Sequence, residues 1–86
     1  MAEHAARRGT VSPEAAFGRV LKSIRNRREL SQDELAARSG YHRTYIGQLE
    51  RGEKSPSLRT LFDLASTLDV APSAIVRKVE LAARAR

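Results

Sequence analysis

The sequence predicts an all-α single domain of five short helices. Apolar residues recur at three- and four-residue intervals in five segments, which is the spacing of one face of a helix. Serine, proline and glycine residues separate these segments, at positions where helices commonly begin and end. No segment alternates between apolar and polar residues as a half-buried strand does. The 86 residues suffice for one domain with one modest hydrophobic core.

The first helix is expected to begin at a serine–proline pair and to run to about residue 28. Ser12 can accept a backbone N–H of the first turn, and Pro13 has a φ angle that is already helical. The buried stripe of this helix is expected to consist of Phe17, Leu21 and Ile24.

Two shorter helices follow, joined by about three residues around a glycine. Ser31 opens the first of them, with Glu34 three residues later in the arrangement of a capping box. Gly40 is expected to end it in the left-handed conformation, and the second helix covers about residues 43–50. Two helices joined in this way form a helix-turn-helix unit, here at about residues 31–51.

The last two helices each have a proline near their expected start. Ser55 and Pro56 repeat the serine–proline start of the first helix, and Pro72 begins the fifth, which we expect to fray after Leu81. The apolar stripe of the fourth helix is expected to consist of Leu58, Leu61, Leu64, Ala65 and Leu68.

The domain organisation follows from these segments. Residues 1–11 contain Ala, Arg and Gly without a periodic apolar face, so we expect a flexible basic N-terminal arm. Residues 12–81 form the expected helical domain, and residues 82–86 are expected to be a frayed tail.

The net charge of the protein indicates which kinds of partner it could bind. Sixteen Lys and Arg residues outnumber ten Asp and Glu residues, which gives a formal net charge of +6. A compact basic surface attracts nucleic acid or an anionic membrane, although a merely solvated basic surface has the same composition. No segment reaches the length needed to span a bilayer, and the N-terminus lacks the apolar run of a secretory signal. We therefore expect a cytoplasmic protein without a membrane partner.

Composition also bears on chemistry. The chain has no cysteine, and its two histidines, His4 and His42, lie far apart, so we expect no metal and no cofactor. No nucleophile–base pair, carboxylate dyad or phosphate-binding loop is recognisable, and we expect that the protein is not an enzyme.

The second helix of the helix-turn-helix has an outward face suited to bases. Arg and Gln match the edges of guanine and adenine with two hydrogen bonds each, and a Thr methyl group can contact the thymine methyl group. Gly47 leaves part of this face without a side chain, so the helix backbone could approach a groove closely. A solvated polar helix face would contain similar residues. The outward residues are Arg43, Thr44 and Gln48.

The run LSQDELAARSGYHRTYIGQLERGEKSPSLRTLFDLASTLDV, residues 30–70, resembles the Xre/Cro-type helix-turn-helix family. Phage repressors and many small bacterial regulators belong to this family. Its features occur here in order: S-Q-x-E-L-A, a glycine turn, Y-I-x-Q-L-E-R-G and S-P-S-L-x-T-L. With the first helix included, the resemblance covers about residues 13–75 and implies the compact lambda-repressor-like fold. The shorter run HRTYI resembles the controller proteins of restriction–modification systems.

The resemblance implies roles for individual positions. Bases are read by the N-terminal half of the third helix, which implies Arg43, Thr44 and Gln48, with His42 at its start. An ion pair between Arg25 and Glu50 is implied to connect the first helix to the third. The residues implied to contact phosphates are Gln32, Tyr45, Arg51 and Lys54.

Two positions depart from the family's pattern. His42 stands where Ser or Thr commonly caps the third helix, so its imidazole either caps the helix or touches a phosphate or a base edge. Tyr41 replaces a small aliphatic residue and is expected to be a turn residue packed over the core.

A single helix-turn-helix contacts only half of a site, so we expect a homodimer. Two recognition helices would then lie about 34 Å apart on a pseudo-palindromic operator. The expected interface is the apolar side of the fifth helix, which consists of Ile75, Val76 and Val79. The same three residues could instead fill the core of the monomer.

We expect a transcriptional regulator that binds a specific sequence of double-stranded DNA through the major groove. We expect it to be encoded by a bacterium or a phage and to act in the cytoplasm. The alternative is an antitoxin-type protein-interaction module that uses the same domain. No small-molecule effector is indicated.

Overall fold

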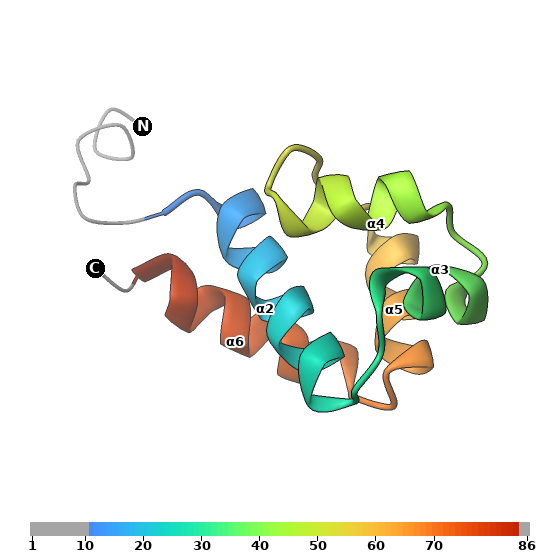
Figure 1. Ribbon diagram of the computed structural model, residues 1–86. Coiled ribbons are helices and arrows are strands. Elements are labelled where there is room, and N and C mark those ends of the chain that lie inside the picture. The colour runs from blue at the N-terminus through green and yellow to red at the C-terminus, as the bar shows by residue number, and fades with distance from the viewer. Residues whose placement is uncertain (1–10, 85–86) are drawn as a thin grey trace.

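The computed structural model describes residues 11–84 of the chain. This part consists of five helices and contains no strand, as predicted. The expected arm, apart from Val11, and residues 85–86 of the expected tail lie outside the described residues. The helices, shown in Figure 1, are α2 (Pro13–Arg27), α3 (Gln32–Ser39), α4 (Arg43–Glu50), α5 (Leu58–Thr67) and α6 (Pro72–Arg84).

Helix α2 begins at the predicted cap and packs along α6. The Ser12 hydroxyl accepts the Ala15 N–H at 3.0 Å, and proline occupies the first helical position. The two helices run in opposite directions (Figure 1), and the N–H of Val11, just before α2, donates to the carbonyl of Ala83 near the end of α6. At the other end, the Arg28 side chain donates to the Leu68 carbonyl at 2.9 Å. This contact ties the end of α2 to the chain that leads into α6.

Helix α6 is longer than predicted. It continues to Arg84, so the expectation of fraying after Leu81 is wrong for residues 82–84. Ala82 packs against the core, and Arg84 pairs with Glu80 one turn earlier at 3.1 Å. The backbone bond between Val11 and Ala83 holds the last turn from the side of α2.

Helix α5 begins two residues later than predicted. Its N-cap is Ser57, whose hydroxyl accepts the Thr60 N–H at 3.0 Å, and Ser55 and Pro56 belong to the preceding segment, which is not helical. Leu58, expected in the buried stripe, is instead 71% exposed at the first position of α5.

The hydrophobic core takes residues from all five helices. Ile75 of α6 is 1% exposed, which corrects the expectation that it forms a dimer interface: it fills the core of the monomer. Val76, its neighbour in sequence, is 51% exposed. The largest side chains that are fully buried are Leu21, Leu35, Ile46, Leu49, Leu64, Leu68 and Ile75.

Candidate nucleic-acid interface

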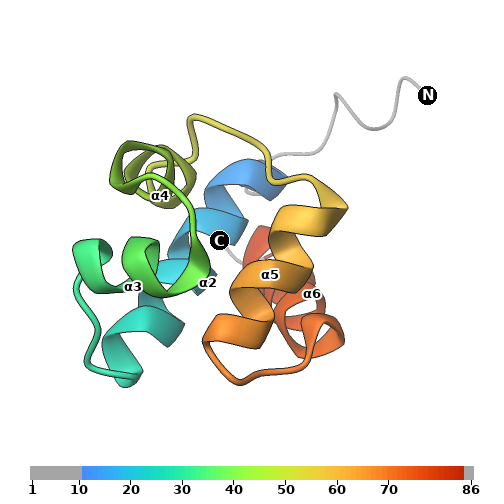
Figure 2. The same cartoon turned by 90° about the vertical axis from the view of Figure 1, so that its right-hand side faces the viewer.

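Helices α3 and α4 lie next to each other on one side of the domain, while α5 and α6 form the other side (Figure 2). The start of α3 is a complete capping box: Ser31 Oγ accepts the Glu34 N–H at 3.0 Å, and the Ser31 N–H donates to Glu34 Oε1 at 2.7 Å. The bond from the Ser31 N–H, and after it the Ser31 hydroxyl, lowers the pKa of the Glu34 carboxyl. At the other end, Gly40 has a φ of 81°, as predicted for a left-handed helix end.

The start of α4 is capped by histidine. His42 Nδ1 accepts the Thr44 N–H at 3.1 Å, and the side chain lies on the surface. The sequence left two roles open for His42, and in the structure His42 caps α4. The bond uses only Nδ1, so the second ring nitrogen, Nε2, stays available to another partner.

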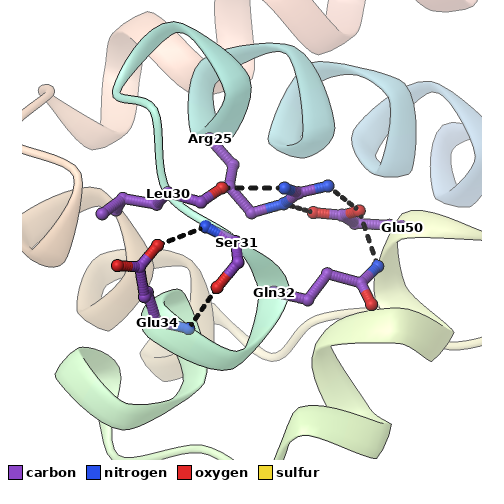
Figure 3. Close-up of polar contacts among 6 residues, drawn as sticks. All are labelled: Arg25, Leu30, Ser31, Gln32, Glu34 and Glu50. Carbon is purple, nitrogen blue, oxygen red and sulfur yellow. Dashed lines mark hydrogen bonds and ion pairs between the residues drawn. The ribbon is translucent and has the colours of Figure 1, made fainter.

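An ion pair ties α2 to α4, as the resemblance implied. Arg25 donates from Nε to Glu50 Oε2 at 2.6 Å and from Nη2 to Oε1 at 2.9 Å (Figure 3). A third bond runs from Arg25 Nη1 to the Leu30 carbonyl at 2.9 Å. The side chains are 10% and 2% exposed, and the bond to Glu50 raises the pKa of Arg25. The Glu50 charge is therefore neutralised inside the domain.

Gln32 of α3 joins this ion pair. Its Nε2 donates to Glu50 Oε1 at 3.0 Å (Figure 3), a contact that the sequence did not indicate. An amide nitrogen has two N–H groups, so one N–H and the amide oxygen remain available at the half-buried side chain. Gln32 is thus fixed in orientation at the N-terminus of α3, where backbone N–H groups and the helix dipole favour an anion.

The outward side of α4 presents the three residues expected there. Arg43 and Thr44 are exposed, and Gln48 is half-buried. Together they form a single face, which we call the recognition face. Arg43 Nε lies 2.8 Å from Asp33 Oδ1 of α3. Asp33 was not singled out from the sequence, although its place in the first turn of α3 was an available signal.

Gly47 does not leave the backbone of α4 open, which corrects that expectation. It is buried, and a Cβ atom added to it would lie 3.0 Å from Arg51 Nη1. The Arg51 guanidinium therefore lies over Gly47, where its Nε bonds to Glu53 Oε2 at 2.7 Å. This bond lowers the pKa of Glu53. Lys54, the next candidate for a phosphate, is exposed.

Two tyrosines contact α5: Tyr41, in the turn before α4, and Tyr45 of α4. Tyr41 packs against the core as predicted, and its hydroxyl donates to Asp63 Oδ2 at 2.7 Å, which raises the pKa of Tyr41. Tyr45 also packs against the core, and its hydroxyl lies 3.4 Å from Thr60 Oγ1. The ring centroids of the two tyrosines are 5.6 Å apart. The Tyr45 hydroxyl thus already has a contact within the domain.

A second surface lies on the side of α5 and α6. A groove with a volume of about 270 Å³ runs between the start of α2, the segment before α5, and α6. Its lining includes Phe17, Leu61 and Val79. At its border is an exposed apolar face, which consists of Leu58, Phe62 and Val76.

Within residues 11–84, no helix has the length and hydrophobicity to cross a membrane. The same residues contain no group of three or more His, Asp or Glu side chains that could bind a metal ion.

The helices α3 and α4, with the turn at Gly40, define a helix-turn-helix protein. Residues 21–75 match the family model described as helix-turn-helix, and the chain belongs to this family. The resemblance to phage repressors and restriction–modification controllers is thereby confirmed.

Three relatives illustrate the family. The control protein C.SmaI of Serratia marcescens is 46% identical over 59 residues, which is 67% of this chain and 70% of that protein. The immunity repressor protein of Bacillus phage phi105 is 41% identical over 59 residues, covering 69% of this chain and 41% of that protein. The crystal structure of the restriction–modification controller protein C.AhdI from Aeromonas hydrophila has a TM-score of 0.69 at 39% identity, covering 71% of this chain and 92% of that chain.

Proposed function

We propose that the chain is a non-enzymatic, cytoplasmic regulator of transcription that binds a pseudo-palindromic operator in double-stranded DNA as a homodimer. The observation that carries the proposal is the position of the recognition face beside the N-terminus of α3, where Gln32 is oriented by the Arg25–Glu50 pair. The names of the relatives, a control protein and an immunity repressor, support regulation as the task.

The recognition face is the proposed reader of bases. Arg43 and Gln48 have the side chains that match guanine and adenine edges with two hydrogen bonds, and Thr44 supplies a methyl group for thymine. His42, at the start of the same helix, would donate from Nε2, since Nδ1 accepts the Thr44 N–H.

The flanking residues are the proposed phosphate contacts. Gln32 would donate its second amide N–H to a phosphate at the positive end of α3. Arg51, Lys54 and Tyr45 would contact the neighbouring phosphates. These contacts fix the register of the protein on DNA and do not select a sequence.

The exposed apolar face is the proposed dimer interface. Leu58 is 71%, Phe62 50% and Val76 51% exposed, which is unusual for large apolar residues that lie together. A second copy would cover them and stabilise a small domain. Val79 lines the adjacent groove and contributes from there, whereas Ile75, at the bottom of the same lining, is only 1% exposed.

Selection of bound duplexes from a random pool tests DNA recognition. We expect a palindromic sequence, with an affinity that falls steeply as salt concentration rises. Gln48→Ala should relax the base preference at one position of each half-site, while Arg51→Ala should weaken binding to all duplexes alike. Unchanged binding of both variants to the selected duplex would refute the assigned contacts. A failure to enrich any sequence would refute the function.

Analytical ultracentrifugation tests the dimer. We expect a dimer at micromolar concentration and a monomer for Leu58→Asp. Leu81→Asp is the matched control, because Leu81 is similarly exposed, at 56%, but lines neither the groove nor the exposed apolar face. Dissociation by both variants, or by neither, would contradict this interface.

A further inference from the structure

Asp33 of α3 and Arg43 of α4 meet across the turn of the helix-turn-helix. Arg43 Nε lies 2.8 Å from Asp33 Oδ1, and the two side chains are 61% and 75% exposed. Arg43 is the first residue of α4, and Asp33 is the second residue of α3. The carboxylate therefore engages an arginine on the recognition face while both groups stay open to a ligand.

A carboxylate at this position opposes DNA binding by charge alone. Asp33 follows Gln32 directly, so it would lie close to the proposed phosphate contact. The other acidic groups of this surface differ: Glu50 is 2% exposed and bonded to Arg25, and Glu53 is paired with Arg51, which lies outside the recognition face. Asp33 is the one of these three whose partner is a proposed base contact.

The position of Arg43 gives the pair a physical basis. A cation at the first residue of α4 lies at the positive end of the helix dipole, which is unfavourable. Asp33 offsets this interaction through an ion pair in which Nε is the guanidinium nitrogen nearest to the carboxylate. The two terminal nitrogens of the guanidinium stay unused by this contact, and they have the spacing that matches guanine O6 and N7.

We propose that Asp33 is a positioning residue that sets base preference: it fixes the Arg43 guanidinium through Nε so that the terminal nitrogens face one guanine in each half-site. The inference rests on the proposed function, and it adds a residue that does not itself touch DNA. Loss of Asp33 removes a repulsive charge and also releases Arg43, so general affinity and sequence preference change in opposite directions.

The test compares two duplexes, one selected by the unaltered protein from a random pool and one with the same bases in permuted order. Dissociation constants for both are measured by fluorescence anisotropy at fixed salt. Asp33→Asn should bind the permuted duplex more tightly, while the ratio of the two dissociation constants falls by about fivefold or more. Single-base variants of the selected duplex should place this loss at one position of each half-site.

Glu53→Gln is the matched control, because it removes the same charge from the partner of Arg51. It should strengthen binding to both duplexes and leave their ratio unchanged. In an Arg43→Ala background, Asp33→Asn should have no further effect on the ratio, since Asp33 acts only through Arg43.

An unchanged ratio for Asp33→Asn, or an equal loss with and without Arg43, would overturn the proposal. An unaltered protein that fails to distinguish the two duplexes would refute the proposed function instead.

Discussion

Arg25 and Glu50, 25 positions apart in the sequence, form a two-bonded ion pair with N–O distances of 2.6 and 2.9 Å. The pair lies between α2 and α4, and Gln32 adds a bond from α3 to the same carboxylate. Three helices thus meet at one buried charge. This arrangement couples the stability of the domain to the orientation of the residue proposed to bind phosphate.

Removal of either partner is expected to destabilise the domain strongly. Arg25→Ala leaves the Glu50 carboxylate, which is 2% exposed, without its counter-charge. Glu50→Ala likewise leaves the Arg25 guanidinium, which is 10% exposed, without its counter-charge. Each variant should lower the free energy of unfolding by about 3 kcal/mol, measured by urea denaturation.

A double variant provides the control for this prediction. Arg25→Met with Glu50→Leu replaces both charges by apolar groups, and it should cost much less than the sum of the single losses. Additive losses would show that the two charges do not interact in the folded protein.

Gly18 of α2 is expected to tolerate no side chain. A Cβ atom there would lie 2.6 Å from the Leu49 carbonyl oxygen of α4, and a backbone atom cannot move aside. Gly18→Ala should therefore lower the free energy of unfolding by about 1–3 kcal/mol, although alanine favours helices over glycine. Thermal unfolding followed by circular dichroism measures the loss.

Gly47→Ala is the matched substitution in α4. The nearest atom to its added Cβ is Arg51 Nη1 at 3.0 Å, the end of a flexible side chain that can shift. Stability should stay the same or rise by up to about 1 kcal/mol. Equal losses for the two glycines would contradict the close approach of α2 to α4.

The helix boundaries that depend on local chemistry were predictable. Ser12, Ser31 and Gly40 act within one turn of their own position, so their roles can be recognised without the rest of the fold. The start of α5 was not predictable in this way, because Ser55 and Ser57 both precede a helical segment. The choice between them depends on the path of the chain after α4.

The candidate site was predictable in part. The resemblance to a family supplied the Arg25–Glu50 pair, which periodicity alone does not reveal. The contact of Asp33 with Arg43 joins two helices, and that of Tyr41 with Asp63 joins the turn before α4 to α5, so neither pairing can be recognised from one segment alone. Similarly, a broad apolar side of α6 does not show which residue enters the core and which stays on the surface.

The capping box of α3 predicts a dependence of stability on acid. Bonds from Ser31 lower the pKa of Glu34, so the charged form is favoured in the folded protein. This contribution is fully present above the ordinary glutamate pKa of about 4.3 and is lost as pH falls through the lower pKa of the folded state. Titration by NMR should give a Glu34 pKa below the ordinary value.

Ser31→Ala tests the cause of this shift. The variant removes the contribution of the Ser31 hydroxyl but keeps the backbone N–H that donates to Glu34 Oε1, so the pKa of Glu34 should rise only part of the way toward its ordinary value. Glu34→Gln should make the free energy of unfolding less dependent on pH below about 4.3. A Glu34 pKa at or above the ordinary value in the unaltered protein would contradict the capping box.

His42 allows its two roles to be separated by two substitutions. His42→Ala removes the acceptor of the Thr44 N–H and should lower the free energy of unfolding by about 1 kcal/mol. His42→Asn supplies another acceptor at the N-cap and should restore most of this stability. Both variants lack the imidazole, so a contact of Nε2 with DNA would be lost in both, whatever their stability. We therefore expect similar losses of affinity for the selected duplex in the two variants. Full affinity in His42→Asn would limit His42 to its capping role, because only the cap is shared between that variant and the unaltered protein.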